Sequence, residues 1–340
     1  MTALMTMSIV AVLAQAPAAA PQTTSAIQNP QTAQKIDSTD ALQLQVMLDR
    51  AGFSPGTIDG RMGSNTRKAL ELFNKSGTPQ PPSVPPTTTY RISAEDTAGP
   101  FIERLPDDMM EAAKLPALGY ASVLELLAER FHSTPAFLQQ LNRGVTFAAD
   151  QEIQVPNVEP MSMPAPAPTN TTTDSNTGRR NGAAGRAPQP VGTSGTQPQA
   201  TPKPDVTVTV SKNNSALTVT DASGGVLLYA PVTTGSEHDP LPIGEWKVTT
   251  IQFNPKFRYN PDLFWDADPS HTKATIQAGP NNPVGLVWIN TSKEHYGLHG
   301  TPEPSTIGRT QSHGCVRLTN WDALRLAALV QPGTRVVFTE

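Results

Sequence analysis

Proline is the feature that most limits how this 340-residue chain can fold, because many of its 34 prolines are concentrated in two stretches. Residues 78–89 carry five of them, and residues 160–204 carry nine and no aromatic residue. Proline interrupts helices and central strands, and a segment without large apolar side chains cannot offset the entropy lost on ordering. We therefore expect a Pro-rich linker at 78–89 and a disordered Pro/Thr/Gly-rich linker at 159–204, with folded blocks between them.

The amino terminus has the pattern of a secretory signal. Residues 1–20 contain a short apolar run, Ile9–Ala14, and small residues at every second position from Ala14 to Ala20. The run is shorter than the ~20 residues that cross a bilayer, and it is typical of the apolar part of a signal peptide. No basic residue precedes the run, so a disordered alanine-rich tail is the alternative. We predict an exported protein of the periplasm or cell envelope.

Charge and cysteine content exclude several classes of protein. The chain has 29 acidic and 25 basic residues, so it lacks the basic field that nucleic-acid binding needs. Its one cysteine can form no intramolecular disulfide and cannot build a cysteine-based zinc cage. We expect no nucleic-acid partner, no metal and no cofactor.

The first block, residues 37–77, has the pattern of a small helical module. Apolar residues at helical spacing predict one helix around Leu44–Leu48 and a second around Ala69–Phe73, which Ser64 or Asn65 would cap. The segment between them, Gly52–Gly60, reads Gly-Phe-Ser-Pro-Gly-Thr-Ile-Asp-Gly and carries two turn dipeptides. This segment and the helices around it resemble the peptidoglycan-binding domain 1 family. The resemblance implies binding to the glycan strands or stem peptides of the cell wall.

The second block, residues 90–158, predicts a small α+β module. Helices are expected over Ser122–Phe131 and after Thr134-Pro135, where threonine caps the helix and proline occupies its first turn. Glu152–Pro156 predicts a strand. The stretches that resemble a divergent LysM module, another glycan binder, are Leu127–Phe131, Leu141-Asn142 and Ile153–Asn157. An unrelated α+β spacer is the alternative, because residues 99–118 have almost no counterpart in LysM.

The third block, residues 205–340, predicts a mainly β domain. Short apolar or alternating segments rich in strand-forming residues recur through it at 206–210, 217–219, 226–232, 244–248, 274–278, 286–290 and 334–338. Only Trp321–Leu329, with Asn320 as its expected cap, is typical of a helix. Many short strands with one helix indicate a β-sandwich or barrel-like core.

The single cysteine, Cys315, lies in Ser-His-Gly-Cys-Val-Arg-Leu and has surroundings that favour a chemical role. A lone cysteine is commonly a buried apolar residue, but an exported protein exposes a free thiol to oxidants. A thiol with its ordinary pKa of ~8.5 is mostly protonated at neutral pH, and an imidazole can accept its proton. The candidate bases are His271, His295, His299 and His313, and spacing alone does not separate them. If the segment is extended, His313 lies on the same face as the thiol.

A zinc site made of His299, His313 and Cys315 is the alternative for this cluster. Neither a matching carboxylate nor a regular ligand spacing supports it.

The same region resembles a known family. The matching stretches are His299-Gly300-Thr301-Pro302, Ile307-Gly308 and Ser312–Leu318, and further matches run through residues 205–340. They resemble the signature of the L,D-transpeptidase (YkuD) family. The resemblance implies that Cys315 is the nucleophile and His299 the proton donor and acceptor, and that His313 shapes the site. It also implies that the N–H of Gly314, with that of Cys315, binds the oxyanion. Arg317, Ser312 and Gly300 are the expected substrate-binding residues.

The resemblance also implies a reaction. Cys315 would attack the third residue of a tetrapeptide stem of peptidoglycan, release the terminal D-Ala and form a thioester. The amine of a second stem would then make a 3→3 cross-link, whereas water would make the enzyme an L,D-carboxypeptidase. A non-catalytic wall-binding protein with the same fold is a further alternative, while the sequence around Cys315 lacks the papain-like signature. We expect carbapenem-type inhibitors to acylate Cys315, and the two amino-terminal modules to act as tethered binders that raise the local substrate concentration.

Overall fold

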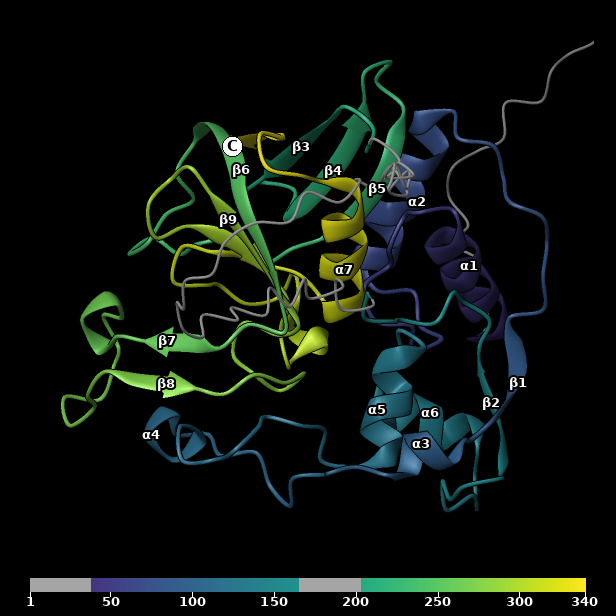
Figure 1. Cartoon of the computed structure of the whole chain (residues 1–340). Coiled ribbons are helices and arrows are strands. Elements are labelled where there is room, and N and C mark those ends of the chain that lie inside the picture. The colour runs from purple at the N-terminus through teal and green to yellow at the C-terminus, as the bar shows by residue number, and fades with distance from the viewer. Residues whose placement is uncertain (1–37, 165–202) are drawn as a thin grey trace, which may run out of the picture. The chain divides into compact units, whose positions relative to one another are not determined.

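The computed structural model describes residues 38–164 and 203–340, which belong to one compact unit (Figure 1). The predicted signal peptide at 1–20 and most of the predicted linker at 159–204 lie outside the described residues. None of the described helices combines the length and the apolar character that a membrane-spanning helix needs.

Helices and strands alternate unevenly along the described chain. The helices are α1 (Ser38–Arg50), α2 (Ser64–Ser76), α3 (Ala94–Thr97), α4 (Met109–Ala112), α5 (Val123–Arg130), α6 (Pro135–Leu141), η1 (Pro261–Leu263), η2 (Pro304–Thr306) and α7 (Asn320–Leu329). The strands are β1 (Thr87–Arg91), β2 (Glu152–Pro156), β3 (Val206–Ser211), β4 (Ala216–Asp221), β5 (Val226–Pro231), β6 (Gly244–Phe253), β7 (Phe257–Tyr259), β8 (Ala274–Ile276), β9 (Val287–Thr291), β10 (Gly297–His299), β11 (Val316–Arg317) and β12 (Arg335–Thr339).

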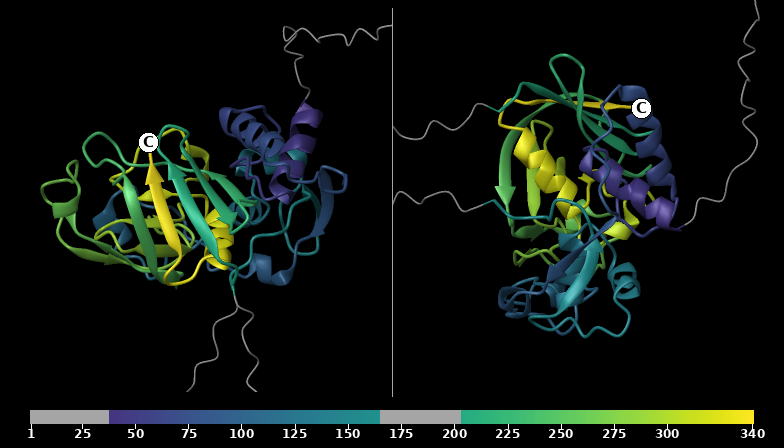
Figure 2. Two further views of the ribbon diagram at one scale, coloured as in Figure 1. Left: turned by 90° about the horizontal axis from the view of Figure 1, so that it is seen from above. Right: turned by 90° about the vertical axis from the view of Figure 1, so that its right-hand side faces the viewer.

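Residues 205–340 are built on one eight-stranded sheet with the strand order β11-β10-β9-β6-β12-β3-β4-β5. The pairs β10–β11 and β3–β12 are parallel, and the other neighbours are antiparallel. Helix α7 contacts β5 at one end of this sheet and β9 and β10 near the other, so the sheet curls around the helix (Figure 2). The predicted mainly β class is confirmed, and its core is a single curled sheet with a separate β7–β8 ribbon.

The packing of this domain follows its sequence pattern. Val206, Val208 and Val210 alternate with less buried residues along β3, and all three lie in the core that also contains one face of α7. Thr319 caps α7, because its Oγ1 accepts from the backbone N of Asp322. The predicted cap, Asn320, is therefore wrong by one residue. Its side-chain amide bonds to Leu286, Pro280 and Glu129 instead.

The amino-terminal helices α1 and α2 share a core with the sheet. Phe53 lies between the rings of Phe73 and Tyr229, at centroid distances of 5.3 and 6.5 Å. The backbone N of Tyr229 in β5 donates to the carbonyl of Gly52, and the backbone N of Ser54 donates to the carbonyl of Tyr229, both at 2.8 Å. These bonds cover the edge of the sheet. The expectation of a separate, tethered module is corrected by these contacts. Gly63 caps α2, and the predicted caps Ser64 and Asn65 lie inside the helix.

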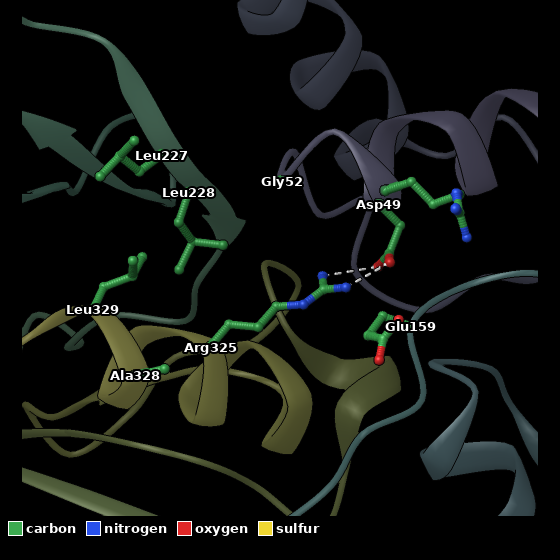
Figure 3. Close-up of a pocket in the computed structure, with 9 residues that line it drawn as sticks. Asp49, Gly52, Glu159, Leu227, Leu228, Arg325, Ala328 and Leu329 are labelled. Atoms are coloured by element: carbon green, nitrogen blue, oxygen red, sulfur yellow. Dashed lines mark hydrogen bonds and ion pairs between the residues drawn. The ribbon is translucent and has the colours of Figure 1, made fainter. Parts of the chain in front are cut away.

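A buried ion pair joins α1 to α7 beside a cavity of about 400 Å³ (Figure 3). Arg325 donates to both carboxylate oxygens of Asp49, at 2.7 and 3.1 Å, and Nδ1 of His132 lies 3.0 Å from the same carboxylate. Burial alone would raise the pKa of Asp49, but Arg325 and His132 hold it well below its usual range. The cavity is lined further by Arg50, Gly52, Glu159, Leu227, Leu228, Ala328 and Leu329. Three stretches of the chain therefore meet at one carboxylate.

Residues 87–158 form the predicted α+β arrangement of two antiparallel strands and short helices. Ser122 and Thr134 cap α5 and α6, Pro135 begins α6, and β2 has the predicted bounds. Strand β1 starts at Thr87, so the predicted boundary at residue 90 cuts into the strand and the linker 78–89 is shorter than expected.

The stretch between α3 and α5 also packs on the third block, residues 205–340. Helix α4 and Leu118 share a small core with Tyr259 and Ile276 of the β7–β8 ribbon. The backbone N of Leu118 donates to the carbonyl of Ala278, at 2.9 Å. Residues 99–118, which have almost no counterpart in LysM, thus support the ribbon.

Glu129 of α5 makes the stability of this assembly depend on pH. Burial raises the pKa of its carboxyl from 4.5 to about 7. The folded state therefore binds more protons than the unfolded chain between these values, so stability falls as the pH rises through this window. Glutamine is neutral at both pH values. We therefore expect the difference in melting temperature, Glu129→Gln minus the unchanged protein, to be more positive at pH 8 than at pH 5. Thermal denaturation at both pH values measures this difference, and an equal difference at the two pH values would contradict the prediction. Burial also raises the pKa of Asp322, but this residue is present in both proteins, so its effect cancels in the difference.

Candidate active site

The parallel pair β10–β11 brings the predicted site residues to one side of the sheet. Its register places Leu298 opposite Val316 and His299 opposite Arg317. Leu298 and Val316 are both 1% exposed and belong to the sheet–α7 core. Because successive side chains in a strand point to opposite faces, His299 and Arg317 face away from that core. Cys315 directly precedes β11 and is partly exposed.

His299 is held as a neutral imidazole with a defined tautomer. Its ring is buried and stacks on Trp288 at a centroid distance of 5.3 Å. Nδ1 lies 2.7 Å from the carbonyl oxygen of Gly300, which can only accept, so we assign the ring proton to Nδ1 and the lone pair to Nε2. Burial and then the nearby Arg317 lower the pKa of His299 to about 3. The ring can therefore accept a proton at neutral pH.

Cys315 rests as a thiol. Burial raises the pKa of Cys315, against the smaller lowering by the N–H of Gly297 and by Arg317. The thiol donates to the carbonyl of His295 across 3.7 Å, rather than to an imidazole. Thiolate must therefore form during the reaction, by transfer of this proton to a base.

Gly314 gives the loop before Cys315 its shape. Its φ of +103° is one that residues with a side chain rarely adopt, and an added Cβ would lie 2.9 Å from Cε1 of Tyr296. The chain bends at residues 313–315, so the premise of an extended segment is wrong. Within the described residues, neither the N–H of Gly314 nor that of Cys315 donates to a protein oxygen. Both are free to bind a developing oxyanion.

Gly314→Ala is expected to lower the rate of acylation of Cys315 by about 100-fold, because the new methyl group displaces either Tyr296 or the two oxyanion donors. The matched control is Gly333→Ala, at a similar φ of +95° with nothing within 4 Å of the added Cβ. Acylation rates and melting temperatures of both variants measure the effect. Equal acylation in the two variants would show that Gly314 is needed for backbone conformation alone.

His313 faces the β7–β8 ribbon. Its Nε2 lies 2.7 Å from a carboxylate oxygen of Asp266, and its ring contacts Phe264 edge-on at a centroid distance of 4.9 Å. Of the other candidate bases, His271 lies between Asp108 and Tyr259, and His295 has an exposed ring. These contacts leave His299 as the candidate base, and they fit His313 as a residue that shapes the site.

Arg317 is a half-buried cation beside the sulfur. Its backbone N and O both bond to Thr233, at 2.9 and 3.0 Å, which fixes the strand. Among the described residues, the arginines that pair with a carboxylate within 4 Å do not include Arg317. Burial lowers the pKa of Arg317. A cation of this kind suits a substrate carboxylate or carbonyl.

Ser312 and Gly300, which were predicted to contact substrate, both make contacts within the protein. The hydroxyl of Ser312 is buried and donates to the carbonyl of Cys315 at 2.6 Å, which closes the loop on itself. Gly300 is buried against Asn320, and its carbonyl accepts from His299. These contacts fix the loop before Cys315 and the ring of His299, and substrate contact by the two residues stays a prediction.

Sequence reasoning missed several partners in the site. Asp266, Thr233 and the carbonyl of His295 come from loops distant in sequence from the residues they contact. No spacing pattern links them to the Ser-His-Gly-Cys segment. As to the zinc alternative, residues 38–164 and 203–340 contain no group of three His, Cys, Asp or Glu side chains placed to hold a metal.

Comparison with known proteins identifies the family of the carboxy-terminal domain. The family model of the YkuD L,D-transpeptidase catalytic domain matches residues 205–338. YqjB of Bacillus subtilis, which carries an L,D-transpeptidase name, is 32% identical over 143 residues, or 40% of this chain and 72% of that protein. YkuD of Bacillus licheniformis, named in the same way, is 51% identical over 63 residues, or 18% of this chain and 38% of that protein. This chain thus covers well under half of that relative.

Among solved structures, an L,D-transpeptidase from Mycobacterium smegmatis matches at a TM-score of 0.33 and 19% identity, over 40% of this chain and 59% of that one. The fold and the family match in sequence define a mainly β catalytic domain of the transpeptidase class. The chain belongs to the L,D-transpeptidase family.

Proposed function

We propose that this protein is an L,D-transpeptidase that acts on peptidoglycan stem peptides through a thioester on Cys315. The observation that supports this most is the state of His299. The Nδ1–H of the ring donates to the Gly300 carbonyl, and the pKa of His299 is lowered to about 3. Nε2 therefore keeps its lone pair as an acceptor, and the ring lies on the side of the sheet that faces away from the core. Arg317, a cation with no carboxylate partner among the described residues, lies next to it in register.

The first half-reaction moves one proton and exchanges two bonds. Nε2 of His299 takes the thiol proton as the sulfur attacks the carbonyl carbon of the third stem residue. Because the pKa of the thiol is raised and that of the imidazole is lowered, a preformed ion pair is unfavourable, and transfer accompanies attack. The N–H groups of Gly314 and Cys315 hold the oxyanion. The imidazolium then protonates the leaving nitrogen, the C–N bond breaks, D-Ala departs and the thioester remains.

The second half-reaction returns the enzyme to its starting state. An amine of a second stem attacks the thioester carbon and gives its proton to His299. The C–S bond breaks, the sulfur regains a proton, and a 3→3 cross-link is left between the stems. Water in place of the amine gives a tripeptide, which is the L,D-carboxypeptidase outcome.

The same chemistry predicts an inhibitor class and a location. A β-lactam of the carbapenem type offers a strained acyl carbon to the same sulfur, so it would acylate Cys315. A cell-wall substrate requires a protein of the periplasm or cell envelope. We also propose that residues 37–77 and 87–158 bind the wall, as their resemblance to wall-binding modules implies.

Incubation with disaccharide-tetrapeptide tests the proposal, with the products separated by mass. Cross-linked dimers and released D-Ala are the expected products, and Cys315→Ala should form none. Tripeptide without dimer would assign the carboxypeptidase reaction, and no turnover by the unchanged protein would favour the non-catalytic wall binder.

A further inference from the structure

Asn320 lies at the first position of α7 with its side chain fully buried and turned away from the helix end. Its Oδ1 accepts from the backbone N of Leu286 at 2.9 Å. Its Nδ2 donates to the carbonyl of Pro280 at 3.2 Å and to Oε1 of Glu129 at 2.7 Å. The amide therefore has its oxygen and nitrogen on distinct partners, which fixes its orientation.

The oxygen of this amide fills the space next to two glycines. A Cβ added to Gly300 would lie 2.1 Å from Oδ1 of Asn320, and one added to Gly285 would lie 2.0 Å from it. Asn320 is thus packed tightly against Gly300, whose carbonyl accepts from Nδ1 of His299. A shift of Asn320 moves Gly300, and a shift of Gly300 changes the direction in which Nε2 of His299 points.

Glu129 is the partner that reaches this amide from outside the catalytic domain. It belongs to α5 of the block at 87–158, it is buried, and an ionised or a protonated carboxyl can accept from Nδ2 through Oε1. Tyr120 lies beside the same carboxyl. Removal of the Glu129 carboxyl leaves one N–H of this buried amide without an acceptor, while the other still donates to the carbonyl of Pro280, so the amide loses part of what fixes its orientation.

We propose that Asn320 is a positioning residue for His299, and that Glu129, from the block predicted to be a separate glycan binder, holds Asn320 in its working orientation. The proposal rests on the assignment of His299 as the base. It makes the block at 87–158 part of the catalytic support, in addition to any binding to the wall.

Glu129→Leu removes the acceptor and tests the proposal. We expect the acylation rate constant at saturating imipenem to fall by about 10- to 100-fold with the imipenem concentration at half-saturation unchanged, because a small misplacement of the base affects the chemical step alone. Glu129→Gln keeps an acceptor oxygen and should restore the rate to within about threefold. The matched control is Glu125→Leu, on the same helix, whose carboxylate accepts from Asn281 of the catalytic domain.

A second measurement does not depend on activity. Nitrogen-15 NMR of the histidine rings should show a slowly exchanging Nδ1 proton on His299 in the unchanged protein and in Glu125→Leu, and its loss in Glu129→Leu. If Glu129→Leu does not fold, Asn320→Ser takes its place with the same two readouts. The proposal is overturned if the rate and the Nδ1 signal survive Glu129→Leu, or if Glu125→Leu lowers the rate as much. If the unchanged protein fails to react with imipenem, the proposed function is wrong, and the NMR comparison still decides whether Glu129 positions His299.

Discussion

Replacement of His299 by alanine is expected to lower the acylation rate constant of Cys315 by about 10³-fold, because general-base catalysis contributes roughly 10²–10⁴. Without the ring, the raised pKa of Cys315 leaves the sulfur protonated and donating to the His295 carbonyl. Stopped-flow mixing with imipenem measures the rate constant directly.

His295→Asn is the control for this prediction. The ring of His295 is exposed, and only its backbone carbonyl meets the thiol, at a φ of +65° that asparagine tolerates. We expect this variant to keep the rate within about threefold. Loss of acylation in His295→Asn, together with an active His299→Ala, would show that His299 is not the base.

Removal of residues 38–77 is expected to leave no soluble folded enzyme. The deletion uncovers Tyr229 and Ala216, which share a core with Phe53 and Phe73. It also removes Asp49 from Arg325 and Ser54 from Asp322, which leaves Arg325 only the longer 3.8 Å pair with Asp322; removal of one partner of a buried ion pair costs about 3–5 kcal/mol. Since whole domains are stable by only about 5–15 kcal/mol, these losses together exceed what the fold tolerates.

Expression of residues 78–340 tests this prediction, with gel filtration and circular dichroism as readouts. A truncation that removes only residues 1–35, which are not among the described residues, is the control and should melt cooperatively. A shortened protein that is soluble, folded and as active on soluble muropeptides as the full chain would contradict the shared core and restore the picture of a tethered module.

The sequence predicts the mainly β domain well, since alternation of valines in β3 and the capping pattern of α5 and α6 are local signals. His299 and Cys315 were also predictable, because the stretches that carry them, His299–Pro302 and Ser312–Leu318, resemble a family signature and lie close together in the sequence. Strand β11 is only two residues long, too short to leave a period in the sequence. Its pairing with β10 depends on the sheet as a whole.

What the sequence could not predict is how the blocks pack. Proline at 78–89 is typical of a linker, yet α1 and α2 dock on β5 through Phe53, a residue 176 positions away from its partner Tyr229. Asn320 shows the same limit at a single residue. Its type and place predict a helix cap, but Thr319 takes that role. The side-chain amide of Asn320 bonds instead to Leu286 and Glu129. Such long-range choices depend on burial, which local propensity does not encode.

The most direct test of a reactive sulfur at Cys315 is the mass of the intact protein after incubation with imipenem, followed by peptide mapping. The account predicts a gain of one drug molecule, located on the peptide that contains Cys315 and absent from Cys315→Ala. An unchanged mass, or an adduct on any other residue, would contradict it.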